Sequence, residues 1–111
     1  MIKYLSLLIF MLSTSAYAGW IAEQTKVIAV ESTSGNTDTF TAIVRGGSGA
    51  CVSLMGDNLI YFPHSEAATS DIHNRTYSML LAALTSGAKV SIYNYADNSC
   101  QKAVGVRMIN E

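Results

Sequence analysis

Residues 77–93 read YSMLLAALTSGAKVSIY and change from a helical pattern to a strand pattern within a few positions. In and before this stretch, mostly apolar side chains recur at intervals of three and four residues, at Ile72, Thr76, Met79, Leu80, Ala83 and Leu84. Ser70 or Thr69 can cap the start of such a helix, and Gly87 stands where helices commonly end. The sequence therefore predicts one long helix over 71–86.

Runs rich in β-branched and aromatic residues lie on both sides of this helix. They predict strands over 26–30, 37–44, 50–55, 59–62, 88–95 and 103–109. Turn formers separate these runs, and the three glycines within 46–49 predict a flexible loop. This order of elements predicts a single, mainly β domain with one α-helix.

The composition excludes several classes of protein. Of the 111 residues, 50% are hydrophobic and 14% are charged, and the net charge is −1. The apolar content is too high for a disordered chain, and the basic excess that phosphate contacts need is missing, so nucleic-acid binding is not expected. A chain of this length accommodates one small domain.

The first residues, 1–18, have the features of a secretory signal peptide. Lys3 precedes an apolar run over 4–12, and residues 16–18 (AYA) form an A-x-A cleavage motif. The run is shorter than the roughly 20 residues that cross a bilayer, although a retained anchor stays open as the alternative. We therefore expect a secreted or periplasmic protein whose mature domain, 19–111, has no membrane span.

An oxidising compartment would allow the two cysteines, Cys51 and Cys100, to form a disulfide. The bridge would close a loop of about 50 residues and stabilise the fold by roughly 4 kcal/mol. The C-x-x-C spacing of redox sites is absent, which favours a structural role over a redox role. We expect the two Cα atoms to lie about 5–6 Å apart.

Motifs for catalysis or cofactor binding are missing from the sequence. His64 and His73 are the only histidines, and they lack the spacing of a helical metal pair. The acidic residues are spread singly, and neither a G-x-S-x-G motif nor a dinucleotide-binding glycine motif occurs. We therefore expect a non-enzymatic protein without metal or cofactor, while an unmarked Ser-His-Asp arrangement stays open.

Two tyrosines, Tyr93 and Tyr95, alternate on one face of the strand predicted over 88–95. Ring faces beside polar side chains suit sugars, whose C–H faces stack on rings while their hydroxyls form hydrogen bonds. The candidate ligand-binding residues are therefore Thr25, Tyr93, Asn94 and Tyr95. The alternative is that these rings complete the core or a subunit interface.

A resemblance to a known family rests on Trp20 just after the cleavage motif, on the ACV segment at 50–52 and on the helix that runs into 77–93. In these features the chain resembles the B subunits of AB5 toxins, of the subtilase-cytotoxin and typhoid-toxin type. The most specific part is TSGAKVSIY at 85–93. The resemblance implies an OB-fold, a five-stranded Greek-key barrel with a helix between the third and fourth strands. It also implies a homopentamer whose helices line a pore, which binds cell-surface glycans and carries a catalytic A subunit.

Two functions follow from these observations. The leading hypothesis is a secreted, non-enzymatic, AB5-toxin-B-like subunit that recognises cell-surface glycans. The alternative is a periplasmic structural or inhibitor-like protein that binds a protein partner through a sheet edge, without sugar affinity. The family's sialoglycan pocket is not carried over, because Gln24 or Thr25 and Asn94 stand where that pocket has a serine and an aromatic residue.

Overall fold

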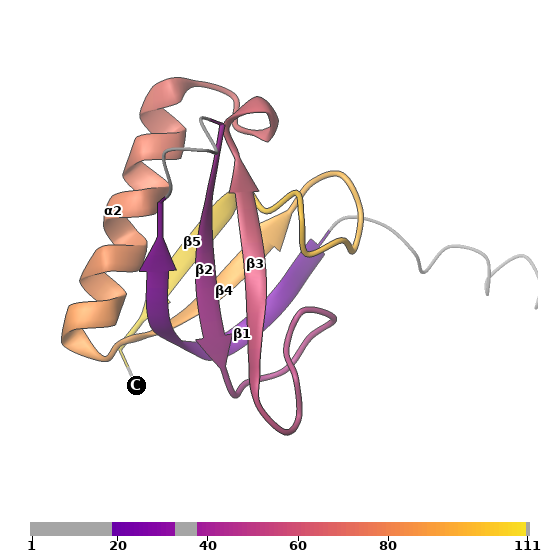
Figure 1. Cartoon of the computed structure of the whole chain (residues 1–111), viewed down its shortest axis with the longest axis vertical. Helices are drawn as coiled ribbons and strands as arrows, with labels where there is room; N and C mark the ends of the chain where they lie inside the picture. The colour runs from indigo at the N-terminus through magenta and orange to yellow at the C-terminus, as the bar shows by residue number, and fades with distance from the viewer. Residues whose placement is uncertain (1–18, 33–37, 111) are drawn as a thin grey trace, which may run out of the picture.

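Five strands and one long helix make up the computed structural model, which describes residues 19–32 and 38–110 (Figure 1). In chain order the elements are β1 (Gly19–Glu31), β2 (Thr39–Arg45), β3 (Asp57–Pro63), a short 3-10 helix η1 (His64–Glu66), α2 (Ser70–Ser86), β4 (Lys89–Asn94) and β5 (Gly105–Ile109). The prediction of a mainly β domain with one α-helix is confirmed. The predicted signal peptide, 1–18, lies outside the described residues.

All five strands belong to one antiparallel sheet in the order β3-β2-β1-β4-β5. The central strand β1 is 13 residues long and has two partners. Its second half, from Lys26 to Glu31, pairs with β2, whereas its first half, from Gly19 to Lys26, pairs with β4. This division lets β1 bend, so the two halves of the sheet curl toward each other beside the helix (Figure 1).

The sheet is not closed, because no strand ladder joins β3 to β5 within 19–32 and 38–110. Two backbone hydrogen bonds nevertheless link β3 to the segment that leads into β5. The Tyr61 amide donates to the Cys100 carbonyl at 2.8 Å, and the Ala103 amide donates to the Tyr61 carbonyl at 3.1 Å. The open side of the sheet is therefore held at one position, in the middle of β3.

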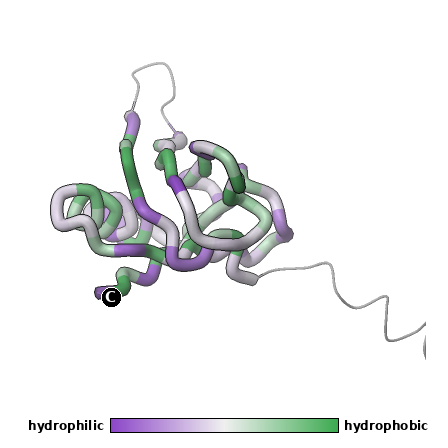
Figure 2. Tube along the Cα trace, turned by 90° about the horizontal axis from the view of Figure 1, so that it is seen from below, coloured by the Kyte–Doolittle hydropathy of each residue, from purple (hydrophilic) through white to green (hydrophobic). Residues whose placement is uncertain are grey.

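The core fills the space between the curled sheet and the helix. Hydrophobic and hydrophilic residues are interspersed along the chain (Figure 2), and the core is built mainly from the buried residues of β1 to β4 and α2. The largest buried apolar side chains come from every strand except β5, and from the helix: Ile21, Val27, Val44, Ile60, Phe62, Leu80, Val90 and Ile92. Phe40 stacks on Phe62 with ring centres 4.9 Å apart, and Tyr77 of the helix packs edge-on against Phe40.

The helix α2 begins and ends with the signals that its sequence indicates. The Thr69 side chain accepts a hydrogen bond from the Ile72 amide at 3.1 Å, which caps the N-terminus. Gly87 adopts φ 78°, a left-handed conformation that glycine enters without steric cost, and its amide donates to the Ala83 carbonyl. The prediction of a helix over 71–86 is confirmed to within one residue.

Two strand predictions need correction. The strand predicted over 26–30 is much longer, because β1 begins at Gly19. Residues 50–55, predicted as a strand, form turns and irregular backbone instead. The reason is that the preceding glycine-rich segment lies directly on β1: the Glu23 amide donates to the Ser48 carbonyl at 2.7 Å, and a Cβ atom at Gly47 would collide with the Glu23 carbonyl.

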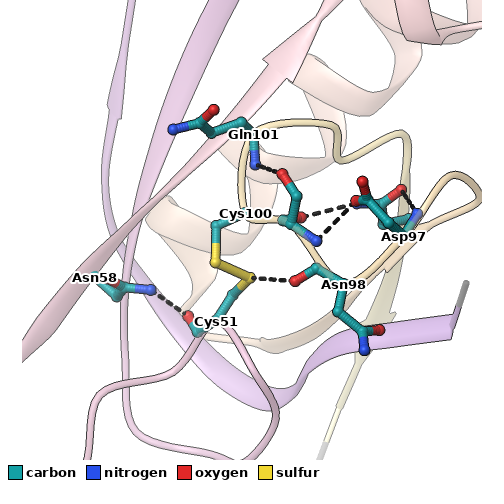
Figure 3. Close-up of a disulfide and its surroundings, with 8 residues drawn as sticks. Cys51, Asn58, Asp97, Asn98, Cys100 and Gln101 are labelled. Carbon is teal, nitrogen blue, oxygen red and sulfur yellow. Dashed lines mark hydrogen bonds between the residues drawn. A yellow bond between two sulfur atoms is a disulfide. The ribbon is translucent and has the colours of Figure 1, made fainter. Parts of the chain in front are cut away.

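The predicted disulfide between Cys51 and Cys100 is confirmed, with a Cα–Cα distance of 5.6 Å (Figure 3). It joins the loop before β3 to the segment before β5, next to the Tyr61 hydrogen bonds. Asn58 strengthens this attachment by donating from its side-chain amide to the Cys51 carbonyl at 2.8 Å. Such a bridge fits a protein located outside the reducing cytoplasm. No helix within 19–32 and 38–110 has the length and apolar character to cross a membrane.

Candidate binding surface

Three aromatic side chains form a continuous row on the outer face of the sheet. Trp20 of β1 and Tyr93 of β4 are directly opposed in the ladder, and their rings meet edge to face with centres 5.0 Å apart. Tyr95 follows Tyr93 with ring centres 4.8 Å apart. We call Trp20, Tyr93 and Tyr95 the aromatic row. Edge-to-face contacts of this kind fix the rings relative to one another.

The aromatic row has a cation packed against Trp20 at one end and an exposed ring, Tyr95, at the other. The guanidinium carbon of Arg107, on β5, lies 4.5 Å from the centre of the Trp20 ring. Trp20 is 37% exposed, whereas Tyr95 is 74% exposed. Gly105 is the β5 partner of Tyr93 and places no side chain beside that ring. The free ring surface is therefore greatest at Tyr95.

A groove of about 410 Å³ adjoins Tyr95, between the first turns of α2 and the start of β5. Its volume lies within the range of small-molecule sites. Ile72 and Met79 of the helix give it apolar walls, while Glu66 and Arg75 add one charge of each sign. Arg75 makes no ion pair with any residue that the structure describes. The groove thus combines apolar surface with two charged groups that form no ion pair with residues 19–32 or 38–110.

Thr25 does not lie where the sequence places it. Its side chain is completely buried, and its hydroxyl donates to the Arg45 carbonyl at 3.2 Å. The prediction that Thr25 offers a surface hydroxyl is therefore wrong. The physical cause is a β-bulge: β1 shifts register against β4 between Ala22 and Thr25, and Gln24 adopts a left-handed φ of 53° there.

Asn94 is also completely buried, so it cannot contact a ligand directly. Its side-chain amide donates to the Ser99 carbonyl at 2.8 Å, and its side-chain oxygen accepts from the Ala96 amide at 2.7 Å. The same side chain also hydrogen-bonds to Asp97. Asn94 therefore holds the turn that follows β4, and through this turn it positions Tyr95.

Of the four residues predicted from the sequence, the structure brings Tyr93 and Tyr95 together on an outer surface and places the other two inside. Trp20 and Arg107 join this surface but were not predicted as site residues. The sequence around Trp20 and Arg107 does not indicate a site, because both residues lie far from Tyr93 in the sequence and come close to it only through strand pairing.

The histidines form a second polar cluster, near the start of the helix. The His64 ring nitrogen Nε2 lies 2.8 Å from the Ser70 hydroxyl, and the rings of His64 and His73 lie 5.2 Å apart. Within 19–32 and 38–110 no carboxylate bonds to His64, so the third member of a Ser-His-Asp arrangement is missing there. The described residues also contain no group of three or more His, Cys, Asp or Glu that is placed to hold a metal ion.

Comparison with known proteins places the chain in a family. The model of a family described as a family of unknown function (DUF5992) matches residues 1–110, which include both the predicted signal peptide and the folded domain. No curated protein and no solved structure matches the chain.

Proposed function

We propose that this chain, which belongs to the DUF5992 family, is a non-enzymatic binding module that recognises a glycan through the aromatic row and the adjoining groove. The observation that carries the proposal is the position of Tyr95. Its ring is 74% exposed, contacts Tyr93 on one side and lines the groove on the other. An exposed aromatic ring beside polar side chains is an arrangement that suits sugars.

The aromatic row and the adjoining groove would bind different parts of a sugar. The C–H face of a sugar ring stacks on Tyr95, and the sugar hydroxyls bond to Arg75 and Glu66 at the edge of the groove. Tyr95 is held in position by its ring contact with Tyr93 and by the turn that the Asn94 side chain stabilises. This support lowers the entropy that binding costs, because the ring is ordered before the ligand arrives.

The assembly is part of the same proposal. We propose an OB-fold barrel of the AB5-toxin-B type, secreted or periplasmic, which forms a homopentamer and carries a catalytic A subunit. Support for the fold comes from the strand order, from the position of the helix between β3 and β4 and from the hydrogen bonds at Tyr61. Support for self-association comes from Leu81 and Leu84, which are 38% and 36% exposed on neighbouring turns of the helix.

Glycan binding is tested on a printed array of cell-surface glycans with the purified protein. We expect a defined subset to bind, and Tyr95→Ala to weaken the strongest binding at least roughly tenfold, a loss of about 1.4 kcal/mol. Tyr95→Phe keeps the ring and should keep most of the affinity. Leu59→Ala, which removes a 43% exposed side chain from β3, is the matched control.

A lack of array binding by the wild-type protein would contradict the proposal. It would favour the alternative, a periplasmic structural or inhibitor-like protein that binds a protein partner. The assembly is tested separately by light scattering at several concentrations. We expect a stable pentamer, whereas a monomer at every concentration would rule out the ring without affecting the glycan proposal.

A further inference from the structure

The loop between Cys51 and β3 carries two apolar side chains that are almost completely exposed. Leu54 is 97% exposed and Met55 is 95% exposed. The other large hydrophobic side chains at the surface of the described residues keep more cover, and Tyr95 at 74% is the next most exposed. Leu54 and Met55 therefore contribute almost no burial to the fold, and adjacent apolar side chains in such a position indicate a contact outside the chain.

The base of this loop is firmly attached, so the two side chains are presented from a fixed position. The disulfide holds Cys51, and the Cys51 amide donates to the Ile21 carbonyl at 2.8 Å. On the other side of the tip, Asn58 binds the Cys51 carbonyl. Leu54 and Met55 can therefore insert into an apolar environment outside the protein while the rest of the loop keeps its attachment to the domain.

A row of cations crosses three strands beside this loop. Lys26 of β1 is directly opposed to Arg45 of β2 on one side and to Lys89 of β4 on the other. Directly opposed residues of an antiparallel pair point to the same face. All three are exposed, so the row lies on the outer face of the sheet, and we call it the basic row. In Figure 1 the bend of β1, the end of β2 and the start of β4 lie toward the same end of the molecule as the 46–56 loop.

Only one of the three charges of the basic row has an ion-pair partner among the residues that the structure describes. Arg45 pairs with Asp57 at 2.7 Å, and this pairing lowers the pKa of the Asp57 carboxyl. Lys26 and Lys89 make no ion pair with residues 19–32 or 38–110. Like charges placed directly opposite each other destabilise a sheet. An anionic surface outside the chain would remove this repulsion.

The apolar tip and the basic row are contiguous. A shallow hollow runs from Arg45 and Asp57 to Leu54 and Met55, so the last cation of the row borders the apolar pair. We propose that this end of the molecule docks on a negatively charged lipid bilayer. The tip enters the apolar side of the headgroup region, and the two lysines of the row, Lys26 and Lys89, face lipid phosphates.

The shape of the surface favours a bilayer over an acidic protein. A standard protein interface buries about 800 Å² on each partner, around an apolar centre. Here the apolar part consists of only two protruding side chains, Leu54 and Met55, which a fluid bilayer accepts individually. The cations lie beside the tip on one face, where a planar array of phosphates can meet them together.

The proposal is tested by co-sedimentation of the purified protein with vesicles. Vesicles of phosphatidylglycerol and phosphatidylcholine in equal parts are compared with phosphatidylcholine alone. We expect binding to the mixed vesicles only, and release as the salt concentration rises. The double variant Leu54→Ser/Met55→Ser should weaken binding at least roughly tenfold, and Lys26→Gln/Lys89→Gln on the order of thirtyfold.

Controls separate docking from general charge effects. Lys102→Gln removes an exposed cation outside the basic row and should leave vesicle binding unchanged. All substituted side chains are exposed, so thermal melting should show that every variant stays folded. Equal binding to both vesicle types, no binding to either, or wild-type binding by the serine double variant would each overturn the proposal. Binding to soluble polyglutamate without vesicle binding would overturn it in favour of an acidic protein partner.

Discussion

The two ends of the β1–β4 ladder have the same backbone architecture and opposite surface chemistry. At one end Trp20 is opposed to Tyr93, and at the other Lys26 is opposed to Lys89. Both pairs lie on the outer face, about 13 Å apart along β4. The aromatic pair is attractive by itself, whereas the lysine pair is repulsive. Strand pairing therefore explains the position of both pairs but the stability of only the aromatic one.

The bulges in β1 lie between these two ends. Ile21 and Ala22 are both buried, and Glu23 and Gln24 are both exposed, so the regular alternation of a strand breaks twice. The Gly47 segment packs against this irregular part and supplies hydrogen bonds that a regular strand would have supplied.

The largest effect is expected from the scaffold that both ends share. Replacing Cys51 and Cys100 together by serine should destabilise the protein by about 4 kcal/mol, because the open side of the sheet loses its covalent tie. Denaturant unfolding measures this change. Glycan and vesicle binding should be lost together near the lowered melting temperature. Loss of one activity alone would show that the ends do not share this support.

A smaller effect, confined to the aromatic end, is expected from Asn94→Ala. The substitution leaves part-buried backbone groups of the following turn without their side-chain partner and should cost about 1 kcal/mol. Glycan affinity should fall because Tyr95 loses its position, while vesicle binding should stay at the wild-type level. An unchanged melting temperature would contradict the structural role that we assign to this side chain.

Truncation of Trp20 and charge reversal of Lys26 should change stability in opposite directions. Trp20→Ala removes the contacts with Tyr93 and Arg107 and should destabilise the domain by about 1–2 kcal/mol. Lys26→Glu places an acid between Arg45 and Lys89 and should stabilise it by roughly 0.5 kcal/mol. Chemical denaturation of both variants without any anionic ligand measures the difference. Destabilisation by Lys26→Glu would mean that the basic row is not repulsive.

The smallest effect is expected from the exposed pair of Arg45 and Asp57. Its hydrogen bond lowers the pKa of the Asp57 carboxyl below the ordinary 3.8, so the stabilisation is complete above that pH. It is lost as the pH falls through the lowered value. Asp57→Asn should therefore be slightly less stable than the wild type at neutral pH and equal to it in strong acid. A thermal melting series of both proteins against pH tests this convergence.

Much of the fold could be predicted because its signals are local. The helix has its cap at Thr69 and its end at Gly87, and the two cysteines allow only one bridge within the chain. The prediction of a strand over 50–55 was wrong because its apolar residues do not pack in the sheet: Leu54 and Met55 are exposed, and Cys51 forms the disulfide. Sequence pattern alone does not distinguish an apolar strand from an apolar loop tip.

The candidate site was only partly predictable, since its residues come together through long-range pairing. Tyr93 and Tyr95 follow from strand alternation, but Asn94 reverses its expected role by turning inward to bind its own turn. Trp20 joins them through the register of β1 with β4, which the bulges displace. A polar residue inside a strand can bond to backbone as readily as to a ligand, so its type does not fix its role.

The most direct test of the aromatic end as the glycan site is amide chemical-shift mapping of the isotope-labelled protein with the strongest binder from the glycan array. We expect the shifted amides to cluster around Trp20, Arg75, residues 93–96 and residues 105–107. The amides of Lys26 and Lys89, at the other end of the ladder, should stay in place. Shifts centred on the basic row, or on the outer face of the helix, would contradict the assignment of glycan binding to the aromatic row.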